Sequence, residues 1–119
     1  MKTNLKTLLT IAQAEVDSCT VEEAKTKVGN QDYVFIDVRE KAELESDGYI
    51  PGAIHIPRGM LEFCIEKSSP YYNPVFESGK NLIFYCKSGG RSVLAAQRAI
   101  DMGLSGVVTM TGGFLAWKN

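Results

Sequence analysis

Two short runs of consecutive apolar residues, at positions 33–36 and 82–85, constrain the fold of this chain most strongly. A run that is apolar on both faces is typical of a strand buried on both sides, as in a parallel sheet. Two further short strands are predicted at 53–56 and 107–110, and helical patterns lie between the strands. Alternating strands and helices predict βαβ units. We therefore expect one α/β domain with a mainly parallel sheet and helices on both of its faces.

The N-terminal segment carries an apolar stripe with helical spacing. Its members fall at i, i+3, i+4, i+7 and i+11: Leu5, Leu8, Leu9, Ala12 and Val16. This spacing predicts an amphipathic helix within residues 1–17 that packs on a domain formed by residues 18–119; an apolar stripe would equally suit dimerisation. Export is the alternative, because the segment starts with basic residues, but its apolar core is shorter than the roughly 7–15 residues of a secretory signal.

The remaining helices are marked by their ends. The capping-box spacing of Thr20 and Glu23 predicts a short helix that ends near Val28. Further helical segments are expected at 40–46, from about residue 91 to Gly103, and as a closing turn at 114–117. The least regular part is 58–80, where one helical turn at 60–65 precedes a loop with two prolines.

Composition excludes several classes of protein. The chain has 119 residues, and 13 Lys+Arg against 14 Asp+Glu leave a net charge of −1, so a nucleic-acid partner is not expected. The longest uncharged stretch, 102–117, contains four glycines and is too polar for a membrane span. Three dispersed cysteines and one histidine provide neither a zinc site nor a paired disulfide framework. We therefore expect a cytoplasmic protein with no metal, cofactor or membrane partner.

Cys86 stands where a parallel sheet places its ligands. It follows the 82–85 run directly, and ligands of open α/β sheets bind beyond the carboxyl ends of the strands. Gly89 and Gly90 let the next loop curl, so that backbone N–H groups and a helix N-terminus converge on one point. Lys87 and Arg91 add positive charge, which stabilises a thiolate. We predict that Cys86 is a nucleophile in a small anion-binding pocket, whereas Cys19 and Cys64 lack such surroundings.

Three stretches resemble a known family. They are residues 35–57, the loop 86–92, and the Gly-Gly-Phe-Leu-Ala-Trp segment 112–117. With these stretches, residues 18–118 resemble the single-domain rhodaneses, the thiosulfate sulfurtransferase family; Gly48-Tyr49 stands where the family usually has Gly-His. The resemblance implies a three-layer α/β/α domain with a central, mainly parallel five-stranded sheet.

The resemblance also implies a reaction and its site residues. Cys86 would take sulfane sulfur from thiosulfate or a related donor and pass it from a persulfide to cyanide or a thiol. The persulfide would lie in a cradle formed by Lys87, Ser88, Gly89, Gly90, Arg91 and Ser92. Four residues separate Cys86 from Arg91, the spacing that accompanies sulfur transfer in this family, whereas cysteine phosphatases have five. The alternative function is a persulfide carrier or protein-interaction module that receives sulfur from a relay protein.

Four more side chains have expected roles. Arg58 follows a predicted strand, so we expect it to face the pocket and attract a dianionic donor, with a solvated surface arginine as the alternative. Asp37 and Arg39 are expected to form a structural ion pair, because buried charges need partners. His55 lies between two isoleucines, and we expect a structural role for it rather than that of a base.

Overall fold

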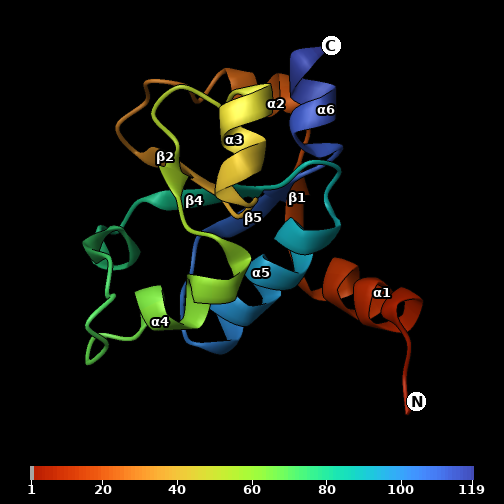
Figure 1. Ribbon diagram of the computed structural model, residues 1–119, viewed down its shortest axis with the longest axis vertical. Coiled ribbons are helices and arrows are strands. Elements are labelled where there is room, and N and C mark those ends of the chain that lie inside the picture. The colour runs from red at the N-terminus through yellow and green to blue at the C-terminus, as the bar shows by residue number, and fades with distance from the viewer. Residues whose placement is uncertain (1) are drawn as a thin grey trace.

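The computed structural model describes residues 2–119 and contains one five-stranded sheet in which every pairing is parallel. The spatial order of the strands is β1-β5-β4-β2-β3 (Figure 1). The strands are β1 (Asp17–Cys19), β2 (Tyr33–Asp37), β3 (Ile54–His55), β4 (Asn81–Tyr85) and β5 (Val107–Met110). The helices are α1 (Leu5–Glu15), α2 (Val21–Lys25), α3 (Lys41–Asp47), α4 (Leu61–Ile65), α5 (Gly90–Asp101) and α6 (Gly113–Lys118), with 3-10 turns η1 (Arg58–Met60) and η2 (Pro74–Glu77).

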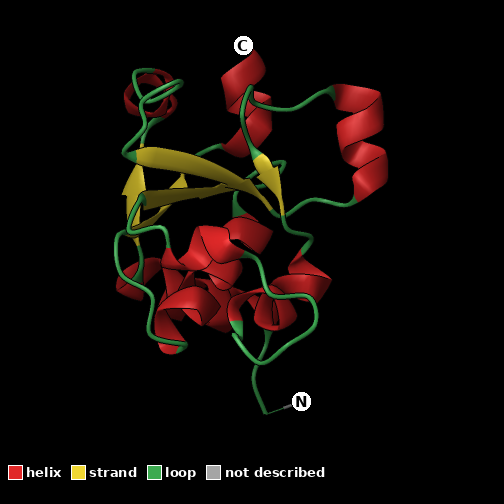
Figure 2. Ribbon diagram, turned by 90° about the vertical axis from the view of Figure 1, so that its left-hand side faces the viewer, coloured by secondary structure: helices red, strands yellow, loops and turns green. Residues whose placement is uncertain are grey.

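Helices cover both faces of the sheet, which confirms the predicted three-layer α/β/α architecture (Figure 2). On one face α1, α4 and α5 bury apolar side chains against Ile36 and Phe84. On the other face α2 and α6 pack against Phe35 and Ile83. Neighbouring residues of one strand therefore enter opposite cores. This two-sided burial is the reason that the two central strands have continuous apolar sequences.

The edge strand β1 was not among the strands that the residue pattern predicted. Its three residues pair with β5, with Asp17 opposite Val108 and Cys19 opposite Met110. Asp17 and Ser18 are exposed, so β1 presents no apolar run that could have marked it as a strand. The resemblance implied five strands, and β1 is the fifth.

The helix α1 lies along α5 and buries only part of its apolar stripe (Figure 1). Ala12 and Val16 are buried and Leu9 is half-buried, whereas Leu5 and Leu8 are 62% and 44% exposed. The helix therefore contacts the domain through its second half, while Leu5 and Leu8 of the predicted stripe stay exposed within residues 2–119. The division into a helix within 1–17 and a domain at 18–119 stays a prediction.

The other elements follow their sequence signals closely. Thr20 and Glu23 form the predicted capping box at α2, although the helix ends at Lys25 and turns continue to Gly29. The irregular segment 58–80 contains η1, α4 and η2. Within residues 2–119, no helix has the length and apolar character that crossing a membrane requires.

Candidate active site

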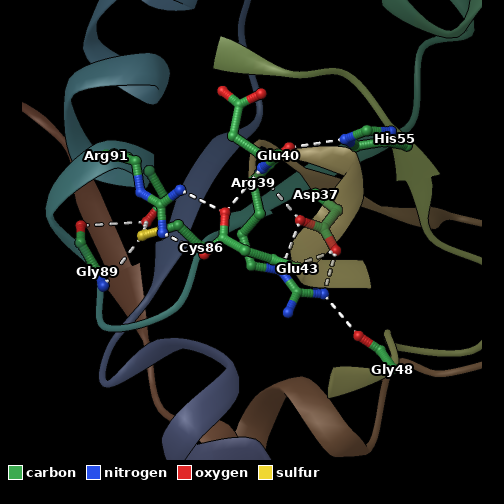
Figure 3. A network of polar contacts seen from close by, with 10 residues as sticks. Asp37, Arg39, Glu40, Glu43, Gly48, His55, Cys86, Gly89 and Arg91 are labelled. Atoms are coloured by element: carbon green, nitrogen blue, oxygen red, sulfur yellow. Dashed lines mark hydrogen bonds and ion pairs between the residues drawn. The ribbon is translucent and has the colours of Figure 1, made fainter. Parts of the chain in front are cut away.

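Cys86 lies at the carboxyl end of the central strand β4, with its side chain buried in the core on the α5 face. The residue is 1% exposed. The loop after it folds back, and the backbone N–H of Gly89 donates a hydrogen bond to the Cys86 sulfur at 3.1 Å (Figure 3). Gly89 has φ +118°, a conformation that side-chain-bearing residues rarely adopt. The glycine thus allows the turn that brings an N–H donor to the sulfur.

The helix α5 begins at Gly90, directly behind this turn. It has twelve residues, and the N–H groups of its first turn have no acceptor within the helix. These groups and the aligned peptide dipoles give the N-terminus a partial positive charge of roughly half a unit. The loop therefore offers a sulfur anion both a direct N–H donor and a favourable field.

A chain of hydroxyl groups leads from the sulfur into the sheet. The Cys86 thiol donates to Ser92 Oγ at a sulfur–oxygen distance of 3.6 Å, and Ser92 Oγ donates to the carbonyl of Gly89 at 3.1 Å. Ser92 Oγ also lies 2.9 Å from the hydroxyl oxygen of Thr109 on β5. Since the Ser92 proton is directed at Gly89, the Thr109 hydroxyl donates to Ser92. Sequence reasoning missed Thr109, although a hydroxyl within an apolar strand was a visible signal.

The first turn of α6 holds the other side of the loop. The N–H of Phe114 donates to the carbonyl of Cys86 at 2.8 Å, and that of Leu115 donates to the carbonyl of Lys87 at 3.1 Å. A Cβ on Gly113 would lie 2.7 Å from the Cys86 carbonyl oxygen and 2.6 Å from the Lys87 carbonyl carbon. Only glycine allows this close approach. The Gly-Gly pair of the 112–117 segment therefore fixes the loop and does more than form a turn.

Arg91 is held by a carboxylate that sequence reasoning did not connect with the site. Its guanidinium makes two hydrogen bonds to Glu43 on α3, at 2.7 and 2.9 Å (Figure 3). The hydrogen bonds from Arg91 lower the pKa of Glu43 to about 2. Glu43 also accepts the N–H of Glu40 at 2.8 Å. Arg91 is thus oriented by a fully ionised partner, and Lys87 and Ser88 form the exposed rim of the loop.

The Asp37–Arg39 pair lies next to the loop without contacting the sulfur (Figure 3). Both side chains are buried, at 0% and 1% exposed, and their closest oxygen–nitrogen distance is 2.7 Å. Arg39 also donates to the carbonyl of Gly48 at 2.8 Å and stacks over the Phe114 ring at 4.4 Å. The arginine therefore joins the ends of β2, α3 and α6, which is the structural role that we expected.

His55 and Arg58 occupy the other edge of the sheet. The His55 Nε2 lies 2.7 Å from the carbonyl oxygen of Arg39, so the ring has a structural partner. Arg58 pairs with Glu62 one turn along the chain, at 3.1 Å. Within residues 2–119 no hydrogen bond or ion pair joins Arg58 to the cysteine loop, and its role in binding a donor stays a prediction.

Comparison with known proteins identifies relatives of the whole domain. The family model described as a rhodanese-like domain matches residues 20–119. A rhodanese domain-containing protein of Drosophila melanogaster is 32% identical over 103 residues, which cover 82% of this chain and 93% of that protein. A sulfurtransferase of Allochromatium vinosum is 26% identical over 103 residues, covering 87% of this chain and 86% of the relative.

Two solved structures share the fold. A protein of unknown function from Rhodopseudomonas palustris, described as a possible tyrosine phosphatase, is 42% identical with a TM-score of 0.94, covering 99% of this chain and 91% of that one. The human single-domain sulfurtransferase is 25% identical with a TM-score of 0.72, covering 87% and 96%. The family match includes the whole cysteine loop and every strand of the sheet except β1. This chain therefore belongs to the family of rhodanese-like domains.

Proposed function

We propose that this protein is a sulfurtransferase that carries sulfane sulfur as a persulfide on Cys86. The hydrogen bond from the Gly89 N–H to the Cys86 sulfur carries the proposal, because it shows a donor aimed at the atom that must be anionic. The names of sulfurtransferases from Allochromatium vinosum and human, which have the same domain, support the reaction class.

The first half-reaction loads the enzyme. The Cys86 thiolate attacks the outer sulfur of thiosulfate, the sulfur–sulfur bond of thiosulfate breaks, and sulfite leaves with the bonding electrons. The new Cys86 persulfide carries its negative charge on the outer sulfur. The N–H groups of the α5 first turn, from Gly90 to Ser92, then stabilise that charge.

The second half-reaction unloads it. Cyanide or a thiolate attacks the outer sulfur, and the electron pair of the broken bond returns to Cys86 as a thiolate. The two steps predict ping-pong kinetics. Neither step needs a general base, which agrees with the engagement of His55 by a backbone carbonyl.

A phosphatase reaction deserves a direct comparison, because the Rhodopseudomonas palustris relative is described as a possible tyrosine phosphatase. A cysteine phosphatase needs an acid that protonates the departing alcohol. Within residues 2–119, the carboxylate that is hydrogen-bonded to the loop is that of Glu43; both of its oxygens accept hydrogen bonds from Arg91, which holds the pKa of Glu43 well below its ordinary value and favours the ionised form. A group that holds no proton cannot donate one. The site therefore favours sulfur transfer, whose leaving group is already a stable anion.

The buried position of Cys86 favours slender reagents over bulky ones. With the residue 1% exposed, thiosulfate, cyanide and small thiols reach the sulfur more easily than a folded protein does. We therefore place the persulfide carrier, loaded by a sulfur-relay protein, second.

The three cysteines are free, and a reducing compartment such as the cytoplasm is the location that we propose.

The test is the intact mass of the reduced protein after incubation with thiosulfate. We expect a gain of one sulfur that cyanide removes, absent in Cys86→Ser and present in the matched control Cys19→Ser. A wild-type protein that gains no sulfur from thiosulfate, but gains it from a persulfide-bearing protein, would favour the carrier. Hydrolysis of para-nitrophenyl phosphate that depends on Cys86, without any persulfide, would replace sulfur transfer by the phosphatase reaction.

A further inference from the structure

A hollow of about 530 Å³ lies beside the cysteine loop, on the side that faces α1. Its walls come from α1, the start of α5, and the carboxyl ends of β1 and β5. The residues around it include Leu9, Gln13, Ser18, Ser88, Thr109 and Thr111. Small-molecule sites commonly have volumes of roughly 300–1,000 Å³. The hollow is therefore large enough for an organic group, which neither thiosulfate nor cyanide has.

In the described part of the chain, the wall of the hollow offers no charged side chain to pair with a bound ion, and the partial positive charge of the α5 N-terminus acts on the sulfur that the loop holds. Among the residues of 2–119 that line the hollow, none is acidic, basic or a histidine. The side chain of Gln13 and the hydroxyls of Ser18 and Thr111 supply hydrogen-bond donors and acceptors, while Leu9 and Val93 supply apolar surface. Such a mixture suits a ligand with amide or hydroxyl groups and no formal charge.

The hollow is connected to the reactive sulfur through the loop itself. Gly89 lines the hollow and also donates its N–H to the Cys86 sulfur. Thr109 lines the hollow and contacts Ser92, whose hydroxyl oxygen accepts a hydrogen bond from the Cys86 thiol. Gly89 and its neighbour Gly90 line the hollow with backbone and carry no side chains. A ligand in the hollow would therefore lie directly against the loop that holds the Cys86 sulfur.

The helix α1 closes the hollow on one side. It precedes residue 20, where the rhodanese-like match begins. Its second half is fixed on the domain by buried Ala12 and Val16. A Cβ on Gly90 would lie 4.0 Å from the Leu9 side chain, which is ordinary van der Waals contact. The Leu9 side chain of the helix thus lies close to the start of α5, at one end of the hollow.

We propose that this hollow binds the organic part of the sulfur acceptor, and that the acceptor is an uncharged thiol with an amide or hydroxyl group. The proposal rests on the sulfurtransferase function proposed above. The acceptor thiolate attacks the outer sulfur of the Cys86 persulfide and forms a new sulfur–sulfur bond. The bond between that sulfur and Cys86 breaks, and its electron pair returns to Cys86 as a thiolate. The acceptor leaves as an organic persulfide.

Binding is tested without any reaction. The thioether S-methyl-N-acetylcysteamine is uncharged and cannot accept sulfur, so it reports on the hollow alone. We expect saturable NMR shifts of the backbone N–H groups of Gly89, Gly90 and Thr111 in the wild-type protein, and none with the sulfonate analogue of equal length. The absence of shifts with the uncharged thioether, or shifts confined to another surface, would refute the assignment of the hollow.

Kinetics test the preference for an uncharged acceptor. With thiosulfate as donor and cyanide as the reference acceptor, kcat/KM for N-acetylcysteamine should exceed that for 2-mercaptoethanesulfonate. Gln13→Lys adds a positive charge to the wall and should shift this ratio toward the sulfonate by about two- to five-fold, as expected for a partly exposed ion pair. Ala14→Lys adds the same charge one residue further along α1, outside the hollow, and should leave the ratio unchanged.

The outcomes separate this inference from the proposed function. One outcome is a protein that forms a persulfide and gives its sulfur to cyanide, but neither binds the thioether nor discriminates between the two thiols. This outcome would overturn only the assignment of the hollow as the acceptor site and would leave the sulfurtransferase proposal standing. Equal changes in Gln13→Lys and Ala14→Lys would also overturn it, because a general surface charge would then explain the ratio. A protein that binds the thioether but forms no persulfide would overturn the sulfurtransferase proposal and leave a binding site.

Discussion

Gly113 is the position at which the packing of α6 against the cysteine loop can be measured most directly. It has φ +62°, and an added Cβ would lie within 2.7 Å of backbone atoms of Cys86 and Lys87. A left-handed conformation costs an alanine about 1–2 kcal/mol. Relief of the contact needs movement of the loop or of α6. That movement weakens the hydrogen bonds from Phe114 and Leu115 to the loop, at about 0.5–1.5 kcal/mol each.

Gly113→Ala should therefore lower the free energy of unfolding by about 2–5 kcal/mol. Gly29→Ala is the matched control, because Gly29 has φ +78° but nothing within 4 Å of its added Cβ, so only the conformational cost of about 1–2 kcal/mol applies. Urea unfolding of both variants, with persulfide formation measured in the same samples, separates the two effects. Equal losses in the two variants, with full persulfide formation in both, would refute the claim that α6 positions the loop.

Three further predictions test the surroundings of the site. Glu43→Gln should lower the free energy of unfolding at pH 7 by about 0.5–1 kcal/mol. Because the pKa of Glu43 in the folded protein lies below its ordinary value, this difference should be full above pH 4.5 and vanish as the pH falls toward 2. Urea titrations that show the same difference at every pH would contradict the ion pair. Thr109→Val keeps the side-chain shape but removes the donor to Ser92, so a loss of about 1 kcal/mol is expected in urea unfolding, and no loss would mean that this hydroxyl contact is not made. Arg39→Met leaves Asp37 buried without its partner and should lower the free energy of unfolding by about 3–5 kcal/mol. The Asp37→Asn/Arg39→Met double variant should recover part of that loss. Additive losses in the double-mutant cycle would contradict a coupled pair.

The parts of the fold that could be predicted are those in which local sequence and global burial agree. The strands β2 and β4 are buried on both faces, so their apolar runs identify them and predict a parallel sheet. The strand β1 is different, because a three-residue polar edge strand is defined by its partner β5 and not by its own side chains. Likewise, the helical spacing of α1 predicts the helix but not which of its apolar residues find a surface to cover, and Leu5 and Leu8 find none within residues 2–119.

In the candidate site, too, contacts between neighbours in sequence could be predicted and contacts from distant elements could not. A cysteine after a strand, two glycines and a helix are contiguous in sequence, so the N–H contact to Cys86 follows from local reasoning. The contacts from Glu43, Thr109 and the α6 turn come from elements far away along the chain. The periodicity of apolar residues along the sequence does not predict which distant elements will contact one another. Sequence reasoning therefore anticipated that the loop after Cys86 turns an N–H donor toward the sulfur, but not which residues hold that loop in place; the roles of Cys86 and of residues 87–92 stay predictions.

The ion pair between Arg91 and Glu43 changes the role that the arginine can have. Sequence reasoning assigned Arg91 as a source of positive charge for the sulfur, but a bidentate carboxylate at 2.7 and 2.9 Å neutralises most of that charge. What remains is an orienting contact between α3 and the start of α5. Stabilisation of the sulfur anion then falls mainly to uncharged groups, the Gly89 N–H and the α5 N-terminus. In the proposed unloading step these same donors would stabilise the Cys86 thiolate as the acceptor takes the outer sulfur, and a stabilised thiolate is the better leaving group.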